Sequence, residues 1–397
     1  MTISQRLGRG VLRWLFGHIR RGAVAVAWSD RSVDVLTGAE EGETAVIIIK
    51  DEARLLRSLL GKGSLGFGAT YIDGTWDSPD LPLLLETASR SIDFRQHGAL
   101  VRPVLSLGRR VWDLRPHRFW SSPIEEIGVH YDLGNDFYAA WLDSTMTYSS
   151  ALFSDDDEPL EQAQLRKYAR LCELLELESG DRVLEIGSGW GGFAEYAATH
   201  HEVEVTGLTL STEMATFARK RLAAAGLAHR TDIKVQDFRA ESGTYDKVVS
   251  IEMIESVQAS EWPDLFETIG SVLRPGGMMA MQAIVIDDRF HEQLTKRDEF
   301  IKTYIFPGGD LPTLGVLRRL ADRSGLSWVT ASTHGSDYAE TLSRWASSFQ
   351  AAWDGIAADA PTFDERFRRM WQYYLAYCEA GFRNGRLDGV QFSAIRV

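Results

Sequence analysis

Apolar and polar positions follow two different patterns along the chain, and the change between them predicts two domains. Over residues 24–50 apolar residues recur at alternate positions, which is typical of strands. Helical spacing follows over Leu81–Arg90 and Leu100–Trp112. We therefore predict a smaller N-terminal α+β accessory domain over residues 1–125, followed by a second domain over residues 126–397.

From about residue 160 the chain alternates between helical patterns and short apolar runs. The predicted strands are Arg182–Ile186, Val203–Leu208, Ile233–Val235, Lys247–Ile251 and Met278–Ile286. The helices among them are predicted over Glu161–Leu177, Phe193–Thr199 and Thr212–Ala225. This alternation predicts a doubly wound α/β fold with a parallel sheet. Ligands in such sheets bind at the carboxyl ends of the strands, near the point where the strand order reverses.

Composition excludes several classes of protein. The chain has 397 residues and a formal charge of −13, which argues against general nucleic-acid binding. No window reaches the roughly 18 apolar residues that a membrane span needs. Only two cysteines occur, Cys172 and Cys378, so neither a disulfide framework nor a cysteine-based zinc site can be built. The histidines show no ligand spacing, and we predict no metal site.

The first 21 residues differ in charge from the rest of the chain. They carry five arginines and no acid, interleaved with apolar residues such as Trp14 and Phe16. A basic amphipathic helix of this kind is typical of a segment that rests on an anionic membrane surface. The alternative is an ordinary helix docked on its own domain, and the sequence leaves both open. We expect a cytoplasmic protein associated peripherally with the inner face of the membrane.

A glycine-rich turn after the first strand of the second domain predicts a nucleotide-type ligand. It reads Glu185-Ile186-Gly187-Ser188-Gly189-Trp190-Gly191-Gly192. Alternate glycines let the backbone approach a ligand closely. A dinucleotide enzyme would place an acid at the end of the next strand, but Gly207–Ser211 contains none. The turn therefore favours S-adenosylmethionine over a nicotinamide cofactor, and with it a Rossmann-like class I methyltransferase domain.

Several further motifs occur in a fixed order along the second domain. They are His130–Tyr138, Met146–Ser149, Glu185–Gly192, Gly207–Ser211, Ser250–Val257, Lys302–Gly309, Asp337–Leu342 and Tyr373–Phe382. With this ordered set the chain resembles the cyclopropane-fatty-acyl-phospholipid synthase family, over about residues 125–397. Members of that family use S-adenosylmethionine to modify double bonds of lipid acyl chains.

The resemblance implies a set of cofactor-binding residues. Tyr148 and Ser149 would contact the methionine carboxylate of the cofactor. Its methionine portion would lie against the glycine turn, at Glu185, Gly187, Gly189 and Trp190. Thr209 and Ser211 would lie near the ribose, and Gln236 and Asp237 near the adenine. The alternative for Thr209 and Ser211 is simple capping of the following helix, and the two roles are compatible.

The resemblance also implies catalytic residues. In the family a bicarbonate ion, held by Cys, Glu, His and Tyr, removes the proton from the cation that methyl transfer leaves. Glu255 and Tyr338 match two of these positions, but Ser150 stands at the cysteine position and Gln282 at the histidine position. Neither Ser nor Gln titrates near neutrality, so bicarbonate is expected to bind more weakly or not at all. Cys378 matches a family cysteine sometimes given as a nucleophile, although its aromatic neighbours also suit a buried structural thiol.

Glu252 adds a second carboxylate three positions before Glu255. If this turn is helical, both carboxylates share one side, and their proximity would raise one pKa toward the value a base needs at pH 7. The alternative is a solvated or capping glutamate. The choice of base decides the product, because loss of a proton from the transferred methyl closes a cyclopropane. Loss from an adjacent chain carbon instead leaves a methyl-branched alkene, and other shifts give a methylene group. The altered site favours a methylated product of this kind over a cyclopropane.

We predict an enzyme that transfers a methyl group to the double bond of an unsaturated phospholipid acyl chain at the membrane surface. Two alternatives stay open: a methyltransferase of a small soluble metabolite, and a non-catalytic lipid-binding relative. The sequence also leaves a homodimer open.

Overall fold

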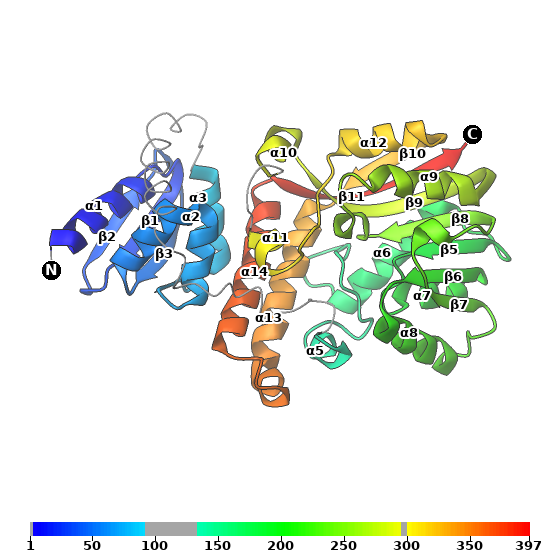
Figure 1. Cartoon of the computed structure of the whole chain (residues 1–397), viewed down its shortest axis with the longest axis horizontal. Helices are drawn as coiled ribbons and strands as arrows, with labels where there is room; N and C mark the ends of the chain where they lie inside the picture. Colours follow the sequence, from blue (N-terminus) through cyan, green and yellow to red (C-terminus); the bar gives the residue numbers. More distant parts are fainter. Residues whose placement is uncertain (1–2, 92–132, 295–299) are drawn as a thin grey trace. The chain divides into compact units, whose positions relative to one another are not determined.

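The computed structural model describes residues 3–91, 133–294 and 300–397, which form two units (Figure 1). The first unit groups Met1–Gly128 with Asp298–Pro307 and Trp353–Asn384, and the second contains the remainder. The sequence assigns those two later segments to the second domain, whereas contacts group them with the N-terminal residues. The boundary predicted near residue 125 and the helix predicted over Leu100–Trp112 lie outside the described residues.

The first unit is built on a four-stranded sheet with the order β2-β1-β3-β4. Its strands are β1 (Arg21–Ala27), β2 (Val33–Thr37), β3 (Glu40–Ile49) and β4 (Trp76–Asp77). Alternation buries one face, where Val24 and Val26 lie beside Ala45 and Ile47 of the parallel neighbour β3. The opposite face leaves Val33, Val35 and Ile48 more than 40% exposed.

Helices pack against this sheet and against one another. They are α1 (Ile3–Phe16), α2 (Glu52–Ile72), α3 (Leu81–Ser91), α11 (Phe300–Tyr304) and α14 (Glu365–Arg383). α3 packs on β1 and β3, while α14 packs on both α2 and α3. The glycine-rich stretch Gly61–Gly68, which carries no helical signal in the sequence, lies inside α2, and Gly63 interrupts the helix with a φ of 57°.

The basic helix α1 is docked on its own unit. It packs on α2 and buries Leu12 completely. Arg9 forms ion pairs with Asp30 at 3.0 Å and Glu52 at 3.3 Å. Trp14 stays 41% exposed. Docking is therefore observed, and it leaves an aromatic side chain of this helix at the surface.

The second unit confirms the predicted doubly wound α/β sheet. Its seven strands have the order β10-β11-β9-β8-β5-β6-β7, and the pairs from β9 to β7 are all parallel. The strands are β5 (Arg182–Ile186), β6 (Glu204–Thr209), β7 (Thr231–Val235), β8 (Tyr245–Ile251), β9 (Leu273–Ile286), β10 (Leu326–Thr333) and β11 (Leu387–Arg396). β10 and β11, which the sequence analysis does not predict, add an antiparallel edge.

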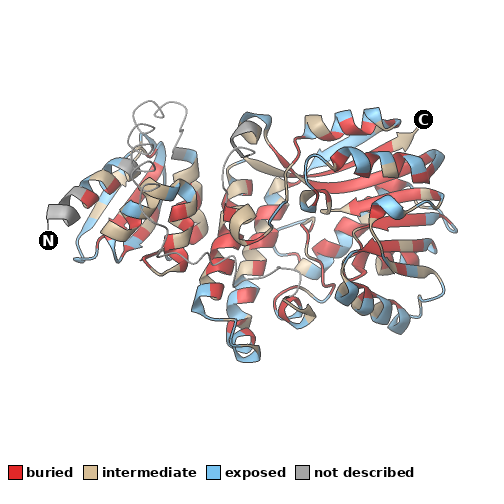
Figure 2. Ribbon diagram, viewed as in Figure 1, coloured by how far each residue is buried: buried red, intermediate tan, exposed pale blue. Residues whose placement is uncertain are grey.

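Helices cover both faces of this sheet, and their buried sides face the strands (Figure 2). One face is covered by α6 (Leu160–Leu175), α7 (Gly192–His201) and α8 (Thr212–Ala224), the other by α9 (Trp262–Val272) and α12 (Leu314–Arg323). The remaining elements are α5 (Asn135–Ala139), η3 (Phe238–Ala240), η4 (Ile254–Ser256), α10 (Asp288–Leu294) and α13 (Gly335–Asp359). No helix within the described ranges is long and apolar enough to cross a membrane. The strand order reverses between β5 and β8, so their carboxyl ends mark the expected ligand site.

Candidate functional site

The glycine turn after β5 has the backbone that a close ligand contact requires. Gly187 has a φ of 88° and Gly189 a φ of 48°, both in the left-handed region. A Cβ on Gly187 would lie 2.8 Å from the side chain of Met253, whereas a Cβ on Gly189 would meet nothing within 4 Å. The amides of Gly187 and Ser188 both donate to the Leu208 carbonyl, which ties the turn to the end of β6. Gly189 thus exposes its backbone beside a fixed turn.

Glu185 supplies an unused acceptor at the start of this turn. The residue is 3% exposed, and its Oε2 has no hydrogen-bond partner among the described residues. Burial raises the pKa of the Glu185 carboxyl well above its usual value, and the charge of Arg221 opposes that rise. A buried carboxyl oxygen without a partner is costly unless a ligand supplies a donor. This position suits the ammonium of an amino-acid ligand.

Tyr148 and Ser149 lie in the segment that precedes α6. The Tyr148 ring lies 5.4 Å from the Tyr138 ring and 5.3 Å from the Trp345 ring, measured between centroids. Tyr138 in turn lies 5.1 Å from Trp190, whose indole N–H donates to Asn135 Oδ1 over 2.7 Å. Trp190 is therefore linked through aromatic packing to Tyr148, as a shared cofactor site would require.

The residues predicted near the ribose and adenine lie at the carboxyl ends of β6 and β7. The Ser211 hydroxyl accepts from the Met214 amide over 3.2 Å and so caps α8, as the capping alternative predicts. Asp237 similarly caps η3. Gln236 donates its side-chain amide to Glu241 over 3.0 Å. Thr209 is the last residue of β6, and the other three lie just beyond the strand ends, where a doubly wound sheet binds ligands.

Three hydrogen bonds converge on the carboxylate of Glu252, just past the end of β8. The Ser150 backbone amide donates to Oε1 over 2.9 Å, and the Gln282 side-chain amide donates to the same oxygen over 2.8 Å. The Tyr338 hydroxyl donates to Oε2 over 2.6 Å. Predicted catalytic positions at 150, 252, 282 and 338 are thus brought together, and the solvated or capping alternative for Glu252 is wrong.

The backbone of Glu252 is itself unusual. Its φ of 47° is in the left-handed region, which costs a residue with a side chain about 1–2 kcal/mol. Its amide donates to the Gln282 carbonyl over 2.8 Å. The condition that residues 252 and 255 share a helical turn is not met, because η4 begins only at Ile254. Left-handed backbone, rather than helical spacing, directs the Glu252 side chain toward its three donors.

Glu255 has a different environment from Glu252. Its Oε1 accepts from the Ile284 backbone amide, and its Oε2 has no partner in the described part of the chain. Burial, together with the negative charge of Glu252, raises the pKa of Glu255 to about 8. Burial also raises the pKa of Glu252, but the charge of Lys167 and the three donated hydrogen bonds oppose that rise. At pH 7 Glu255 is therefore mostly protonated.

Two polar residues that the sequence analysis missed support this cluster. Gln391 on β11 donates to Gln282 Oε1 over 2.8 Å, which keeps the Gln282 amide nitrogen directed at Glu252. Lys167 on α6 is completely buried and donates to Ser149 Oγ over 2.6 Å. A glutamine inside an apolar strand, and a lysine on the apolar side of a helix, were the signals available.

Cys378 lies on α14 of the first unit, whereas the carboxylate cluster is built entirely from the second unit. Its predicted role as nucleophile therefore stays a prediction. Cys172 is completely buried on α6, as expected of a core residue. Within the described ranges, no group of three or more His, Cys, Asp or Glu side chains could hold a metal ion.

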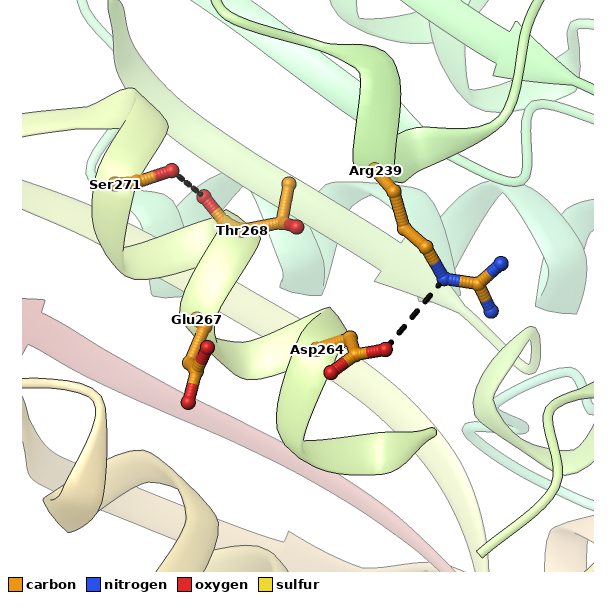
Figure 3. A pocket seen from close by; sticks show the side chains of 5 residues that line it. All are labelled: Arg239, Asp264, Glu267, Thr268 and Ser271. Atoms are coloured by element: carbon orange, nitrogen blue, oxygen red, sulfur yellow. Dashed lines mark hydrogen bonds and ion pairs between the residues drawn. The ribbon is translucent and has the colours of Figure 1, made fainter. Parts of the chain in front are cut away.

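A shallow pocket elsewhere on the second unit does not compete with this site. It lies on α9 and is lined by Arg239, Asp264, Glu267, Thr268 and Ser271 (Figure 3). Arg239 approaches Asp264 at 3.7 Å and also pairs with Asp237 and Glu261. The pocket is thus lined by one arginine that faces several surface carboxylates, and none of its lining residues belongs to the predicted site.

Comparisons with known proteins give a consistent family assignment. The family described as "Mycolic acid cyclopropane synthetase" matches residues 120–392. Tuberculostearic acid methyltransferase UfaA1 of Mycobacterium tuberculosis is 40% identical over 91% of this chain and 85% of its own length. The cyclopropane-fatty-acyl-phospholipid synthase of Escherichia coli K12 is 35% identical over 82% of each chain.

A solved structure extends the comparison to the fold. Mycolic acid cyclopropane synthase CmaA1, complexed with SAH and CTAB, superposes with a TM-score of 0.64 at 28% identity. It covers 72% of this chain and all of its own. The second unit therefore has the class I methyltransferase fold. This chain belongs to the cyclopropane synthase family, enzymes that use S-adenosylmethionine to methylate or cyclopropanate fatty acyl chains.

Proposed function

We propose that this enzyme methylates the double bond of an unsaturated phospholipid acyl chain, and that the Glu252 carboxylate is its base. The phospholipid assignment is supported by the E. coli relative, whose name specifies a fatty-acyl phospholipid. One observation carries the assignment of the base. The donors at positions 150, 282 and 338, which the family resemblance assigns to bicarbonate, all donate here to Glu252. A side chain of the protein thus takes the place of the diffusible anion.

The cofactor site fits S-adenosylmethionine on two features of this chain. The unpartnered Glu185 oxygen can accept from the ammonium of the cofactor, and Gly189 leaves its backbone open to a ligand. Ser149 and Tyr148 would hold the carboxylate at the other end of the methionine portion. When bound, S-adenosylmethionine supplies an electrophilic methyl group on a sulfonium.

The acid–base assignment follows from the two glutamates. The alkene electron pair forms the new carbon–carbon bond as the methyl leaves sulfur, and the positive charge moves to the neighbouring acyl carbon. Glu252, ionised and held by three donors, accepts the proton that this cation loses. Glu255 is protonated near pH 7 because burial and Glu252 raise its pKa to about 8. A neutral Glu255 leaves a single negative charge beside the cation.

The product follows from which proton Glu252 reaches. The carboxylate is tethered, with both oxygens committed to fixed donors, so it cannot move along the acyl chain as a free ion can. We infer that it removes a proton from an adjacent chain carbon, which leaves a methyl-branched alkene. If a hydride shift first moves the cation to the methylated carbon, loss of a proton from the transferred methyl leaves a methylene branch, and neither route closes a cyclopropane. The name of the relative from M. tuberculosis, a tuberculostearic acid methyltransferase, supports methylation.

Contact with a membrane surface is part of the proposal. A lipid substrate must reach the enzyme from a bilayer, and α1 presents the exposed Trp14 on an arginine-rich helix. Tryptophan is well suited to the boundary between headgroups and acyl chains.

The test is mass spectrometry with double-bond localisation on lipids from expressing cells fed isotopically labelled methionine. The proposal expects label in a methyl or methylene branch of phospholipid acyl chains. Label confined to saturated cyclopropane rings would overturn the proposed product. No label in any lipid would favour the alternative of a small soluble substrate, for which turnover by purified enzyme would not respond to phospholipid vesicles.

A further inference from the structure

Lys167 is a buried charged group that the proposed reaction does not use. It lies on α6 with no exposed surface, and its Nζ lies 2.6 Å from Ser149 Oγ. The same nitrogen lies 5.0 Å from the centre of the Tyr168 ring, within range of a cation–π contact. The carboxylates of Glu252 and Asp143 act on it through their charge, without a hydrogen bond to it. Lysine is rarely buried in this way, because desolvation of the ammonium costs free energy that specific contacts must offset.

The contact with Lys167 fixes which way the Ser149 hydroxyl can donate. An ammonium has donors only, so Ser149 Oγ must be the acceptor. The Ser149 carbonyl meanwhile accepts from the Gln164 amide over 2.9 Å, which holds the residue in place. In the described part of the chain the hydroxyl proton of Ser149 has no acceptor. That proton is therefore free for a ligand.

We infer that Lys167 is a positioning residue, which holds Ser149 as a hydrogen-bond donor toward the carboxylate of S-adenosylmethionine. The inference rests on the proposed function, which assigns Ser149 to that carboxylate. The positive charge beside Ser149 would add attraction for an anion that Ser149 itself cannot supply. A neutral amine could instead accept from Ser149 and turn its proton away from the ligand.

The charge of Lys167 depends on the groups around it. Burial lowers the pKa of Lys167 to about 7, and the carboxylates of Glu252 and Asp143 oppose this. Glu252 follows β8, and Asp143 lies in the segment before α6. His334 faces the same region from the connection between β10 and α13. Burial and the charge of Lys167 lower the pKa of His334 to about 4, so His334 is neutral at pH 7.

Further charges lie along α6. Lys247 of β8 donates to the Glu176 carbonyl at the C-terminal end of the helix, and the charges of Glu185 and Arg221 act on the neighbouring Tyr168. β9 and β11 place the amides Gln282 and Gln391 beside Glu252. α7 places Tyr196 against the ring of Tyr168, and burial raises the pKa of the Tyr196 phenol above its usual value. A carboxylate bound at Ser149 would place a negative charge beside Lys167 and would favour the ammonium form of that lysine.

The test compares two ligands that differ at the proposed contact. S-adenosylhomocysteine carries the amino-acid carboxylate, and 5′-methylthioadenosine lacks it. By calorimetry on the full-length protein, Lys167→Met should weaken S-adenosylhomocysteine binding about tenfold or more, and should leave 5′-methylthioadenosine within about twofold. Ser149→Ala should give a similar selective loss, and the double variant should lose little more than either alone. Lys247→Met, which removes a second buried lysine near the start of β8, is the matched control and should change neither affinity.

The wild-type protein provides a readout that needs no variant. Its affinity for S-adenosylhomocysteine should fall as the pH rises from 7 to 9, while that for 5′-methylthioadenosine stays flat. Equal loss of both ligands in Lys167→Met, or no pH difference between them in the wild type, would overturn the inference. If Ser149→Ala leaves both affinities unchanged, the assignment of Ser149 fails with it. Lipid labelling tests the proposed reaction separately, because it does not depend on either ligand comparison.

Discussion

Replacing Glu252 by glycine separates its two unusual properties, a strained backbone and a bonded carboxylate. The φ of 47° costs a glutamate about 1–2 kcal/mol, and glycine relieves that cost. Glycine also removes the acceptor for three donors, from Ser150, Gln282 and Tyr338. Each buried donor left without an acceptor costs about 1–3 kcal/mol. The lost acceptor outweighs the relief, so Glu252→Gly should be less stable than wild type in anion-free buffer.

The same change should remove the base and create a site for a replacement. Loss of a general base typically slows a reaction about 100- to 10,000-fold. Bicarbonate or formate can enter the space that the carboxylate leaves, because the same three donors remain. At an anion concentration ten times its Kd, binding stabilises the variant by about 1.4 kcal/mol. For a unit of this size that raises the melting temperature by about 3–6 °C.

The assay is methyl transfer to unsaturated phospholipid vesicles in carbon-dioxide-depleted buffer, with and without added bicarbonate or formate. Melting temperatures are measured under the same conditions. Glu176→Gly is the matched control, because Glu176 also has a left-handed φ, of 52°, but lies exposed at the end of α6. It should gain stability without responding to anions. Wild-type activity that requires bicarbonate, or a Glu252→Gly variant that is fully active without added anion, would refute the assignment of the base.

Three further predictions concern neighbouring groups and the membrane. Tyr338→Phe removes a 2.6 Å hydrogen bond to Glu252, worth about 1.5–3 kcal/mol. The kcat should therefore fall about 10- to 100-fold, with the KM for S-adenosylmethionine unchanged. An effect on KM alone would contradict the role of Tyr338 in holding the base. Glu255→Gln mimics the protonated acid. The raised pKa of Glu255, about 8, makes the wild-type free energy of unfolding decline as the pH rises from about 4.5 through 8. In urea unfolding, Glu255→Gln should therefore be more stable than wild type at pH 9 but not at pH 4. Trp14→Ala should reduce flotation with anionic vesicles, whereas Val35→Ala, at a strand position that is more exposed than Trp14, should not. The reverse result would assign lipid contact to the open sheet face instead of α1.

Most helices and strands of the second unit could be predicted from the sequence because each has its own pattern of apolar residues. Arg182–Ile186 is an apolar run that ends at a glycine, and the structure gives β5 the same bounds. β10 could not be found in this way, since most of Leu326–Thr333 is exposed and shows no apolar alternation. The helix through Gly61–Gly68 was hidden for a different reason. Glycine disfavours helix in isolation, and only packing of the α2 helix against its neighbours offsets that cost.

The cofactor-binding residues were also easier to predict from the sequence than the catalytic residues. Glu185 and the glycine turn lie within eight consecutive positions, so their spacing alone indicates a ligand. The carboxylate cluster draws on four segments separated by dozens of residues, which only a family resemblance could relate. By that resemblance alone, Ser150 and Gln282 count as lost catalytic residues, because each stands where the family has a residue that titrates. The compensating gain, a carboxylate directed by left-handed backbone, appears only in three dimensions.

The replacement of the family's cysteine and histidine by Ser150 and Gln282 is physically consistent with a base that is part of the protein. A diffusible anion must be recruited from dilute solution, and a histidine that can carry positive charge assists its binding. A carboxylate attached to the backbone has a very high effective concentration and needs no recruitment. It needs only neutral donors that fix its orientation, which a backbone amide, a glutamine and a tyrosine provide. A positive histidine beside Glu252 would instead lower the pKa of the base and oppose a neighbouring cation. Gln282 therefore suits a built-in base better than histidine would.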